Sequence, residues 1–274
     1  SQYQVRLMCK ALKVSRAGYY RWMSVNSFQG STKKEALSEK IKDIYEDSRR
    51  TYGSPRVHAI LLRSKVNVSR STVSRIMKKL GLYSEIRKKW KPRKKRKNNS
   101  NLAENLLNRD FNPSTKDHSW AGDITYIWTS QGWVYLSVIL DLFSRKVIGW
   151  RLEKHMEASL VTSTFVTAFM NRRPESTITF HSDPGVQYQS GSFSKLLAAL
   201  DIRQSMNNPG ECYDNAAMES FFKTIKVELL YRTRLQDLES TRSRIFEWIE
   251  CFYNRKRIHS TLGFLSPEEY ELKY

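Results

Sequence analysis

Three carboxylate residues stand at positions where they could hold divalent metal ions. Asp183 closes an apolar strand-like run, and after 35 intervening residues Glu219 opens a helix-like run. Asp123 lies upstream in another strand-like run. Carboxylate oxygens are hard ligands of the kind that Mg²⁺ prefers, and separate elements can deliver them to one place. On a chain with a formal net charge of +20, such a site indicates phosphodiester chemistry on nucleic acid.

The composition favours a globular, DNA-binding protein. The 274 residues are 40% apolar and 12% aromatic, which is enough for a sizeable core with one or two satellite domains. No run approaches the ~20 consecutive apolar residues of a spanning helix, so no membrane partner is expected. The start shows no signal-peptide pattern. The three cysteines (Cys9, Cys212 and Cys251) lack metal-ligand spacing, which predicts a reducing, cytoplasmic setting.

The N-terminal third is predicted to be helical. Residues 1–30 are expected to form a short helical segment, and residues 31–86 a helix-turn-helix domain. Within that domain Ser69 is a good cap for a helix that ends before Gly81. The basic residues expected to contact DNA from this helix are Arg70, Arg75, Lys78 and Lys79. A plain three-helix bundle with a solvated basic face is the alternative.

Residues 87–115 are predicted to be a basic linker. Nine of the eleven residues from 87 to 97 are lysine or arginine, and like charges at that density repel one another. Bound along phosphates, such residues release counterions and make affinity steeply salt-dependent. A solubilising tether or a targeting address is the alternative. The predicted DNA contacts here are Arg87, Lys88, Lys89, Lys91, Arg93, Lys94, Lys95 and Arg96.

Residues 116–232 are predicted to be an α/β domain. Strand-like runs at residues 120–128, 133–142 and 147–152 form an antiparallel meander. A helix, a strand, a helix, a short fifth strand and a third helix follow. This order predicts a mixed five-stranded sheet with helices packed on it.

The element order and four motifs resemble the ribonuclease H-like core of DDE transposases and retroviral integrases. They are most similar to bacterial insertion-sequence transposases of the IS-three family, of the OrfB or fused OrfAB type. The resemblance covers nearly the whole chain, including the helix-turn-helix block. The motifs are DITY (123–126), HSDPGVQY (181–188), DNAAMESFF (214–222) and YNRKRIHSTLG (253–263).

The resemblance implies an activity and a set of ligands. It implies a DNA transposase that cleaves element ends and transfers strands by attack of a 3′ hydroxyl, with Asp123, Asp183 and Glu219 as catalytic residues. Asp123 and Asp183 would share one Mg²⁺ ion, and Glu219 would join Asp123 on a second, with Mn²⁺ able to substitute and no zinc. The implied partner is double-stranded DNA, held by a homo-oligomer. A nuclease without strand transfer, or a repressor with an inactive core, is the alternative.

Several residues near the three acids are predicted to support them. Lys223 and Lys226 share a helix face with Glu219. The resemblance implies that Lys226 contacts DNA, and for Lys223 a DNA contact and an intrahelical Glu–Lys pair worth ~0.2–0.5 kcal/mol are both open. His181 and Asn215 are expected to support the site, with a packed histidine as the alternative for His181. The remaining acids read as turn or surface residues: Asp141, Asp201, Asp214 and Glu228.

Residues 233–274 are predicted to be a helical extension. A long helix over residues 238–253 is followed by a basic cluster, from which Arg255 and Arg257 are expected to reach DNA or a second protomer. Docking of the helix on the core is the alternative. Ser266 and Pro267 are expected to begin a last short helix.

Overall fold

The computed structural model describes residues 4–25, 28–84, 103–108, 111–207 and 215–274. The chain divides into two compact units, Ser1–Ser84 and Glu85–Tyr274, each of which is described by itself. The predicted basic run at residues 87–97 lies outside the described residues, and so do Cys212 and Asp214. In the described residues, no helix is both long and apolar enough to cross a membrane.

The first unit is entirely helical where it is described. Ser69 accepts a hydrogen bond from the backbone N–H of Thr72 at 3.2 Å and so caps the last helix, as predicted. Pro55 stands in the first turn of the helix before it, where its missing N–H costs nothing. The helices are α1 (Val5–Ala11), α2 (Arg16–Val25), α3 (Phe28–Asp47), α4 (Ser54–Arg63) and α5 (Arg70–Lys79).

The core of this unit lies between α3, α4 and α5. Apolar side chains at helical spacing face inward, and the five that are at most 2% exposed are Ile41, Tyr52, Val57, Leu61 and Val73. The short connection between α4 and α5 places one helix directly after the other. This arrangement agrees with the predicted helix-turn-helix unit.

The second unit is built on a five-stranded mixed sheet of order β3-β2-β1-β4-β5. The first three strands form the predicted antiparallel meander, while β4 runs parallel to β1 and β5 parallel to β4. The strands are β1 (Ser119–Thr129), β2 (Gly132–Asp141), β3 (Val147–Glu153), β4 (Thr179–Ser182) and β5 (Arg203–Met206). The predicted strand order along the chain is confirmed.

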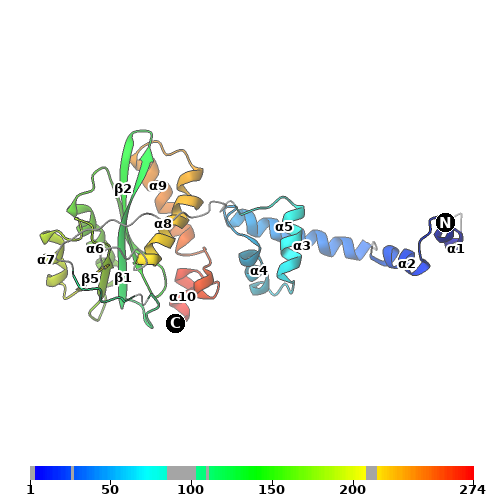
Figure 1. Ribbon diagram of the computed structural model, residues 1–274, viewed down its shortest axis with the longest axis horizontal. Helices are drawn as coiled ribbons and strands as arrows, with labels where there is room; N and C mark the ends of the chain where they lie inside the picture. The colour runs from blue at the N-terminus through cyan, green and yellow to red at the C-terminus, as the bar shows by residue number, and fades with distance from the viewer. Residues whose placement is uncertain (1–3, 26–27, 85–102, 109–110, 208–214) are drawn as a thin grey trace. The chain divides into compact units, whose positions relative to one another are not determined.

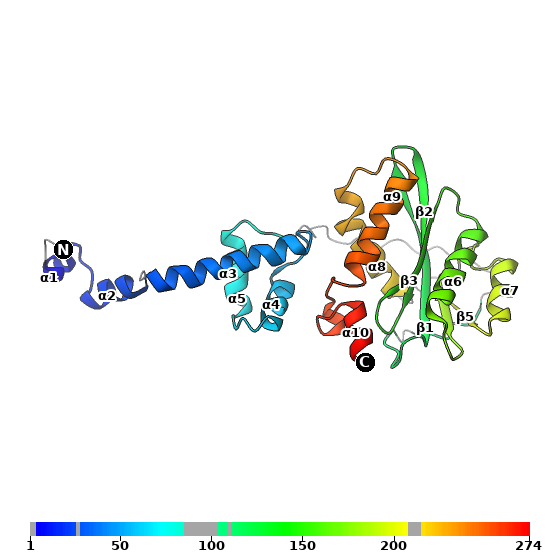
Figure 2. The ribbon, with the colours of Figure 1, turned by 180° about the vertical axis from the view of Figure 1, so that it is seen from behind.

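Helices cover both faces of this sheet (Figure 1, and from behind in Figure 2). One face packs against α6 (Ala158–Arg172) and α7 (Gly191–Ala199) around a core that includes Trp120, Phe165 and Phe180. The other packs against α8 (Ala216–Glu228) and α9 (Leu238–Phe246). Because side chains alternate along a strand, neighbouring residues of β1 serve different cores.

The C-terminal segment differs in detail from the predicted long helix. After α9 the chain continues as a π-helix, η3 (Glu247–Tyr253), so the hydrogen-bond register changes within the segment. Short 3₁₀ turns stand at η2 (Leu230–Arg232) and η4 (Ser260–Leu262). The last helix, α10 (Pro267–Lys273), starts with a capping box between Ser266 and Glu269, as predicted.

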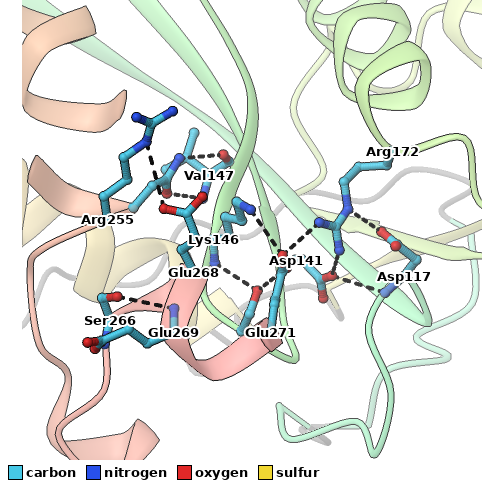
Figure 3. Close-up of polar contacts among 12 residues, drawn as sticks. Asp117, Asp141, Lys146, Val147, Arg172, Arg255, Ser266, Glu268, Glu269 and Glu271 are labelled. Atoms are coloured by element: carbon cyan, nitrogen blue, oxygen red, sulfur yellow. Dashed lines mark hydrogen bonds and ion pairs between the residues drawn. The ribbon is translucent and has the colours of Figure 1, made fainter. Parts of the chain in front are cut away.

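An ion-pair network fixes α10 to the sheet domain (Figure 3). Arg172, at the end of α6, reaches Asp117 at 2.7 Å, Asp141 at 2.9 Å and Glu271 of α10 at 2.9 Å. Asp141 also accepts the backbone N–H of Phe143, so it is a turn residue as predicted. Burial raises the pKa of Asp141 to about 6 in spite of these partners.

Candidate active site

The sheet register brings two of the three predicted catalytic acids to the same level. Gly122 of β1 pairs with Ser182 of β4 in parallel register, and Asp123 and Asp183 are the next residues on the two strands. The closeness of the strands follows from the apolar runs before each acid, which bury Trp120 and Phe180 in one core. The arrangement predicted for Asp123 and Asp183 is therefore present.

The electrostatics of Asp123 show which charged groups lie around it. Its pKa is raised well above the ordinary value, first by burial, then by the negative charge of Asp183, and to a smaller extent by Glu219. The backbone N–H of Ile124, which donates to Asp123 Oδ1 at 2.7 Å, and the positive charge of Lys226 lower the pKa. Asp183, Glu219 and Lys226 are therefore all close enough to influence the charge of Asp123.

The other two carboxylates also have raised pKa values. Burial raises the pKa of Asp183, against a backbone hydrogen bond from Gly185 that lowers it. Partial removal from water raises the pKa of Glu219, which stands in the first turn of α8. Acids that repel one another and resist ionisation are expected at a site that a cation completes.

The helix α8 determines how Glu219 and the two lysines are presented. Met218, Phe221 and Ile225 are buried in the core on this face of the sheet, whereas Glu219 and Lys223 lie on the exposed side of the helix. Lys223 is exposed, whereas Lys226 is partly buried and close enough to influence Asp123. The structure thus brings Lys226 to the acids and leaves Lys223 toward solvent.

The three predicted metal ligands have the donor atoms that a divalent metal ion of this kind requires. Carboxylate oxygens at Asp123, Asp183 and Glu219 form a purely hard-ligand set, which suits Mg²⁺ or Mn²⁺ rather than the cysteine and histidine ligands typical of structural zinc. Within the described ranges, no three His, Cys, Asp or Glu side chains converge closely enough to enclose an ion as they stand. Glu219 is exposed, so it has room to approach the two aspartates.

His181 is fully buried and held by the neighbouring strand. Its Nδ1 lies 2.8 Å from Ser205 Oγ, and its Nε2 lies 2.5 Å from Asn207 Oδ1. Asn207 in turn donates its backbone N–H to the carbonyl of Ser182 at 3.2 Å. The histidine is therefore packed, and its contacts fix the end of β4 just before Asp183.

Asn215 lies at the start of α8, four residues before Glu219. It is 5% exposed, and its side chain makes no capping hydrogen bond to the helix. Its Oδ1 is buried without a hydrogen-bond partner among the described residues. A supporting role for Asn215 remains a prediction.

Tyr188 is a residue of the site that the sequence reasoning did not single out. It is 2% exposed, and burial together with the charges of Asp123 and Asp183 raises its pKa well above the ordinary value. The Ser137 hydroxyl is near enough to lower this pKa but is not aligned for a hydrogen bond with Tyr188. Its position at the end of the HSDPGVQY motif, five residues after Asp183, was the only feature of the sequence that pointed to it.

Gly122 is the reason that Tyr188 can approach the catalytic strand. A Cβ atom built on Gly122 would lie 2.5 Å from Phe180 Cζ and 3.3 Å from Tyr188 Oη. Only glycine leaves space for both rings. The residue before Asp123 is thus part of the site through its lack of a side chain.

Comparisons with known proteins agree with this geometry. Models of an integrase core domain match residues 113–212 and 200–267, and a model of an HTH-like domain matches residues 32–90. The chain is 35% identical over 275 residues to transposase InsF for insertion sequence IS3A of Escherichia coli (strain K12), which covers 100% of this chain and 96% of that protein. The chain belongs to the IS3 family of insertion-sequence transposases. The predicted family and the ribonuclease H-like fold class are thereby confirmed.

Other proteins are similar over long stretches. The transposase is 34% identical over 267 residues to the insertion element IS600 uncharacterized 31 kDa protein of Shigella sonnei, covering 97% of this chain and 98% of that one. Among solved structures, the HTLV-2 integrase catalytic core domain in complex with magnesium gives a TM-score of 0.44 at 17% identity, over 57% of this chain and 96% of that chain. The catalytic domain of Mos1 mariner transposase gives 0.41 at 14% identity, over 57% and 74%.

The predicted DNA-contacting residues of the transposase outside α8 fall into three groups. On α5, all four basic side chains are exposed: Arg70, Arg75, Lys78 and Lys79. The eight arginines and lysines predicted in the linker lie outside the described residues. In the C-terminal segment Arg255 is exposed, with Glu268 3.7 Å from its Nε.

Arg257 is a correction to the sequence prediction. Its side chain is buried and makes two hydrogen bonds to Glu228, from Nε at 2.9 Å and from Nη2 at 2.8 Å. Glu228 is 3% exposed, so its assignment as a turn or surface acid is wrong. Because the guanidinium is buried and paired with Glu228, the prediction that Arg257 contacts DNA is wrong.

Proposed function

We propose that this transposase cleaves the ends of an insertion sequence and joins each released 3′ hydroxyl to another phosphodiester. Asp123, Asp183 and Glu219 are the catalytic residues. The observation that carries this assignment is the electrostatic convergence of all three acids and Lys226 where β1, β4 and α8 meet. Three separated segments of the chain would have no structural reason to place like charges together.

Two Mg²⁺ ions, or Mn²⁺ in their place, are the proposed cofactors, with Asp123 and Asp183 on one and Asp123 and Glu219 on the other. Bound metal of this kind activates the attacking oxygen and neutralises charge on the leaving oxygen of an in-line displacement. The all-carboxylate donor set favours Mg²⁺ over zinc at this position. Because raised pKa values mean competition with protons, occupancy should weaken as the pH falls.

The remaining residues bind and orient the DNA. Lys226 places a positive charge beside Asp123, where it can pair with a phosphate at the scissile position. Lys223, one turn earlier on α8, is exposed and available to the adjacent backbone. His181 holds its strand so that Asp183 stays level with Asp123, and Asn215 supports the start of α8.

The proposed partner is double-stranded DNA, comprising the element ends and the target, in the bacterial cytoplasm. Residues 31–86 bind DNA through α5, and residues 87–115 add contacts to phosphates. A homo-oligomer holds two ends together. The HTH-like domain and the net charge of +20 support this arrangement.

Substitution of one catalytic acid tests the proposal. Asp183→Asn should abolish Mg²⁺-dependent cleavage and joining of end-containing DNA while leaving DNA affinity largely intact. Asp201→Asn is the matched control, because Asp201 is an exposed residue of positive φ, a conformation that asparagine also tolerates. If Asp183→Asn still cleaved DNA, the site assignment would be wrong.

Sequencing of the products separates transposition from simple hydrolysis. When DNA with a free 3′ hydroxyl at the element end is supplied, a transposase gives joined strands. Cleaved ends without joined strands would indicate a nuclease on the same fold.

A further inference from the structure

On the face of the sheet that packs against α6, one part of the sheet is left without a helix. The hairpin of β1 and β2 extends beyond α6, as both ribbon views show (Figures 1 and 2). Along this end, Tyr126 lies directly opposite Tyr135, and Trp128 lies directly opposite Trp133. We call these four residues the hairpin aromatic face. Alternation along the strands puts them on the same side as Ile139, which is buried in the core under α6.

The hairpin aromatic face exposes an unusual amount of aromatic surface. Trp128 is 61% exposed, Trp133 is 53% exposed and Tyr126 is 49% exposed. Scattered single apolar residues on a surface need no explanation, but a contiguous aromatic patch marks an interaction site. Tyr135 is partly buried, whereas the other three side chains present about half of their surface or more to solvent.

The rings already pack against one another. Trp128 and Trp133 meet edge to face, with centroids 5.0 Å apart and an interplanar angle of 70°. Tyr126 meets Trp133 in the same way, at 6.1 Å and 88°. Such side chains lose little conformational freedom when a partner covers them, which is why tryptophan and tyrosine dominate protein interfaces.

The charges next to the patch favour a protein over DNA. On β3, Arg151 lies opposite Ser137 and Glu153 lies opposite Tyr135, so both are on the aromatic side of the sheet. The whole chain has 47 basic and 27 acidic residues, but on this side of β3 one acidic residue balances one basic residue. The strand next to the patch therefore lacks the excess of positive charge that phosphates require. Edge-to-face rings also leave fewer free faces on which bases could stack.

The same charges favour a second copy of this chain as the partner. A twofold interface uses one surface twice, so the surface must be complementary to itself. Arg151 and Glu153 stand two residues apart on one strand and one face. When two such strands approach in opposite directions, Arg151 faces Glu153 of the partner subunit, and the pairing is repeated across the axis.

We propose that the hairpin aromatic face is the interface between two copies of the transposase. The face forms the apolar centre, and Arg151 and Glu153 form the charged rim that fixes the register. The inference deepens the proposed function, because it names the surface that holds together the two subunits needed for two DNA ends. Its test measures association and does not depend on cleavage.

A charge-reversal cycle followed by sedimentation velocity tests the pairing in the full chain. Arg151→Glu alone and Glu153→Arg alone each create two like-charge contacts in the dimer and should weaken dimerisation by about tenfold or more. The double variant restores opposite charges and should return within about threefold of the unaltered protein. Arg203→Glu, on the exposed side of the opposite edge strand β5, is the matched control and should leave the dimer unchanged.

The aromatic residues are tested by Trp128→Ser and Trp133→Ser. Each should shift the protein to monomer at micromolar concentration while its thermal unfolding stays cooperative. A protein that is monomeric without substitution, or a double charge variant that fails to recover, would overturn the proposal. So would tryptophan variants that remain dimeric but lose DNA affinity, since the face would then be a DNA contact.

Dimerisation and strand joining can be tested separately. Asp183→Asn protein should dimerise like the unaltered protein, because Asp183 directly follows β4 and is not part of the β1–β2 hairpin. A dimer that forms as described but joins no DNA would contradict the proposed function and leave the interface standing.

Discussion

At the residue scale, the position of Asp123 depends on its neighbours more than on its own chemistry. Gly122 allows Phe180 and the Tyr188 hydroxyl to come close to the strand, and those rings fix the backbone from which Asp123 projects. On the strand beside it, His181 is held through Ser205 and Asn207. Two acids of raised pKa can be kept together only if their backbones cannot move apart.

Gly122→Ala is predicted to lower both stability and activity, although it leaves the carboxylate of Asp123 unchanged. The added methyl group would lie 2.5 Å from Phe180 Cζ, so the strand or the ring must shift. We expect a loss of roughly 1–3 kcal/mol in the free energy of unfolding, as for other overpacked cores. Urea denaturation measures it, and cleavage assays should show lower activity with DNA affinity retained.

The control for that variant is Gly191→Ala. Gly191 is the first residue of α7, and a Cβ atom there meets nothing within 4 Å. It should unfold at the same urea concentration as the unaltered protein or a slightly higher one, since alanine favours a helix. Equal stability of the two alanine variants would contradict the steric explanation.

At the element scale, local sequence predicted most of the fold. The strands and helices of the sheet domain were visible because their apolar residues repeat with the period of each element. Residues with local partners, such as Ser69 and Ser266, were also predicted correctly as caps. The π-helix η3 was not predicted, since its apolar pattern resembles that of an ordinary α-helix.

Contacts between elements that are far apart in the chain could not be predicted from the sequence. Glu228 ends α8 and Arg257 follows η3, 29 positions later, so no local pattern connects them. Glu228 was predicted to be a turn or surface acid, and Arg257 to reach DNA or a second protomer, because charged residues are usually exposed. The same limit applies to Tyr188, whose importance depends on a glycine in another strand.

The Glu228–Arg257 pair is predicted to lock α8 to the C-terminal segment. Arg257→Met would leave the carboxylate of Glu228 buried and unpaired, which should cost about 3–5 kcal/mol. Replacing both residues, with Glu228→Gln added, should recover much of that loss because no buried charge remains. Denaturation of the two single variants and the double variant measures the coupling, and strictly additive losses would argue against a direct interaction.

At the scale of the whole molecule, one guanidinium takes part in attaching the last helix to the sheet domain. Arg172 lies in α6, Asp117 precedes β1, Asp141 ends β2 and Glu271 lies in α10, so four segments meet at one side chain (Figure 3). Lys146, which is 3.0 Å from Glu271, is a second cation in this network. The network therefore acts as a joint between α10 and the sheet domain.

Arg172→Gln is predicted to release α10 before the rest of the domain unfolds. Three partly or fully buried carboxylates would lose their main partner, at a cost of several kcal/mol. Hydrogen exchange should then show faster exchange in α10 than in β1 or β2. Lowering the pH should reduce this loss of stability. The pKa of Asp141 is raised to about 6, so its ionised form destabilises the fold. Protonation below that pH removes the buried charge that Arg172 no longer neutralises. Uniformly faster exchange across the sheet, with no preference for α10, would show that the network stabilises the core as a whole and is not a joint.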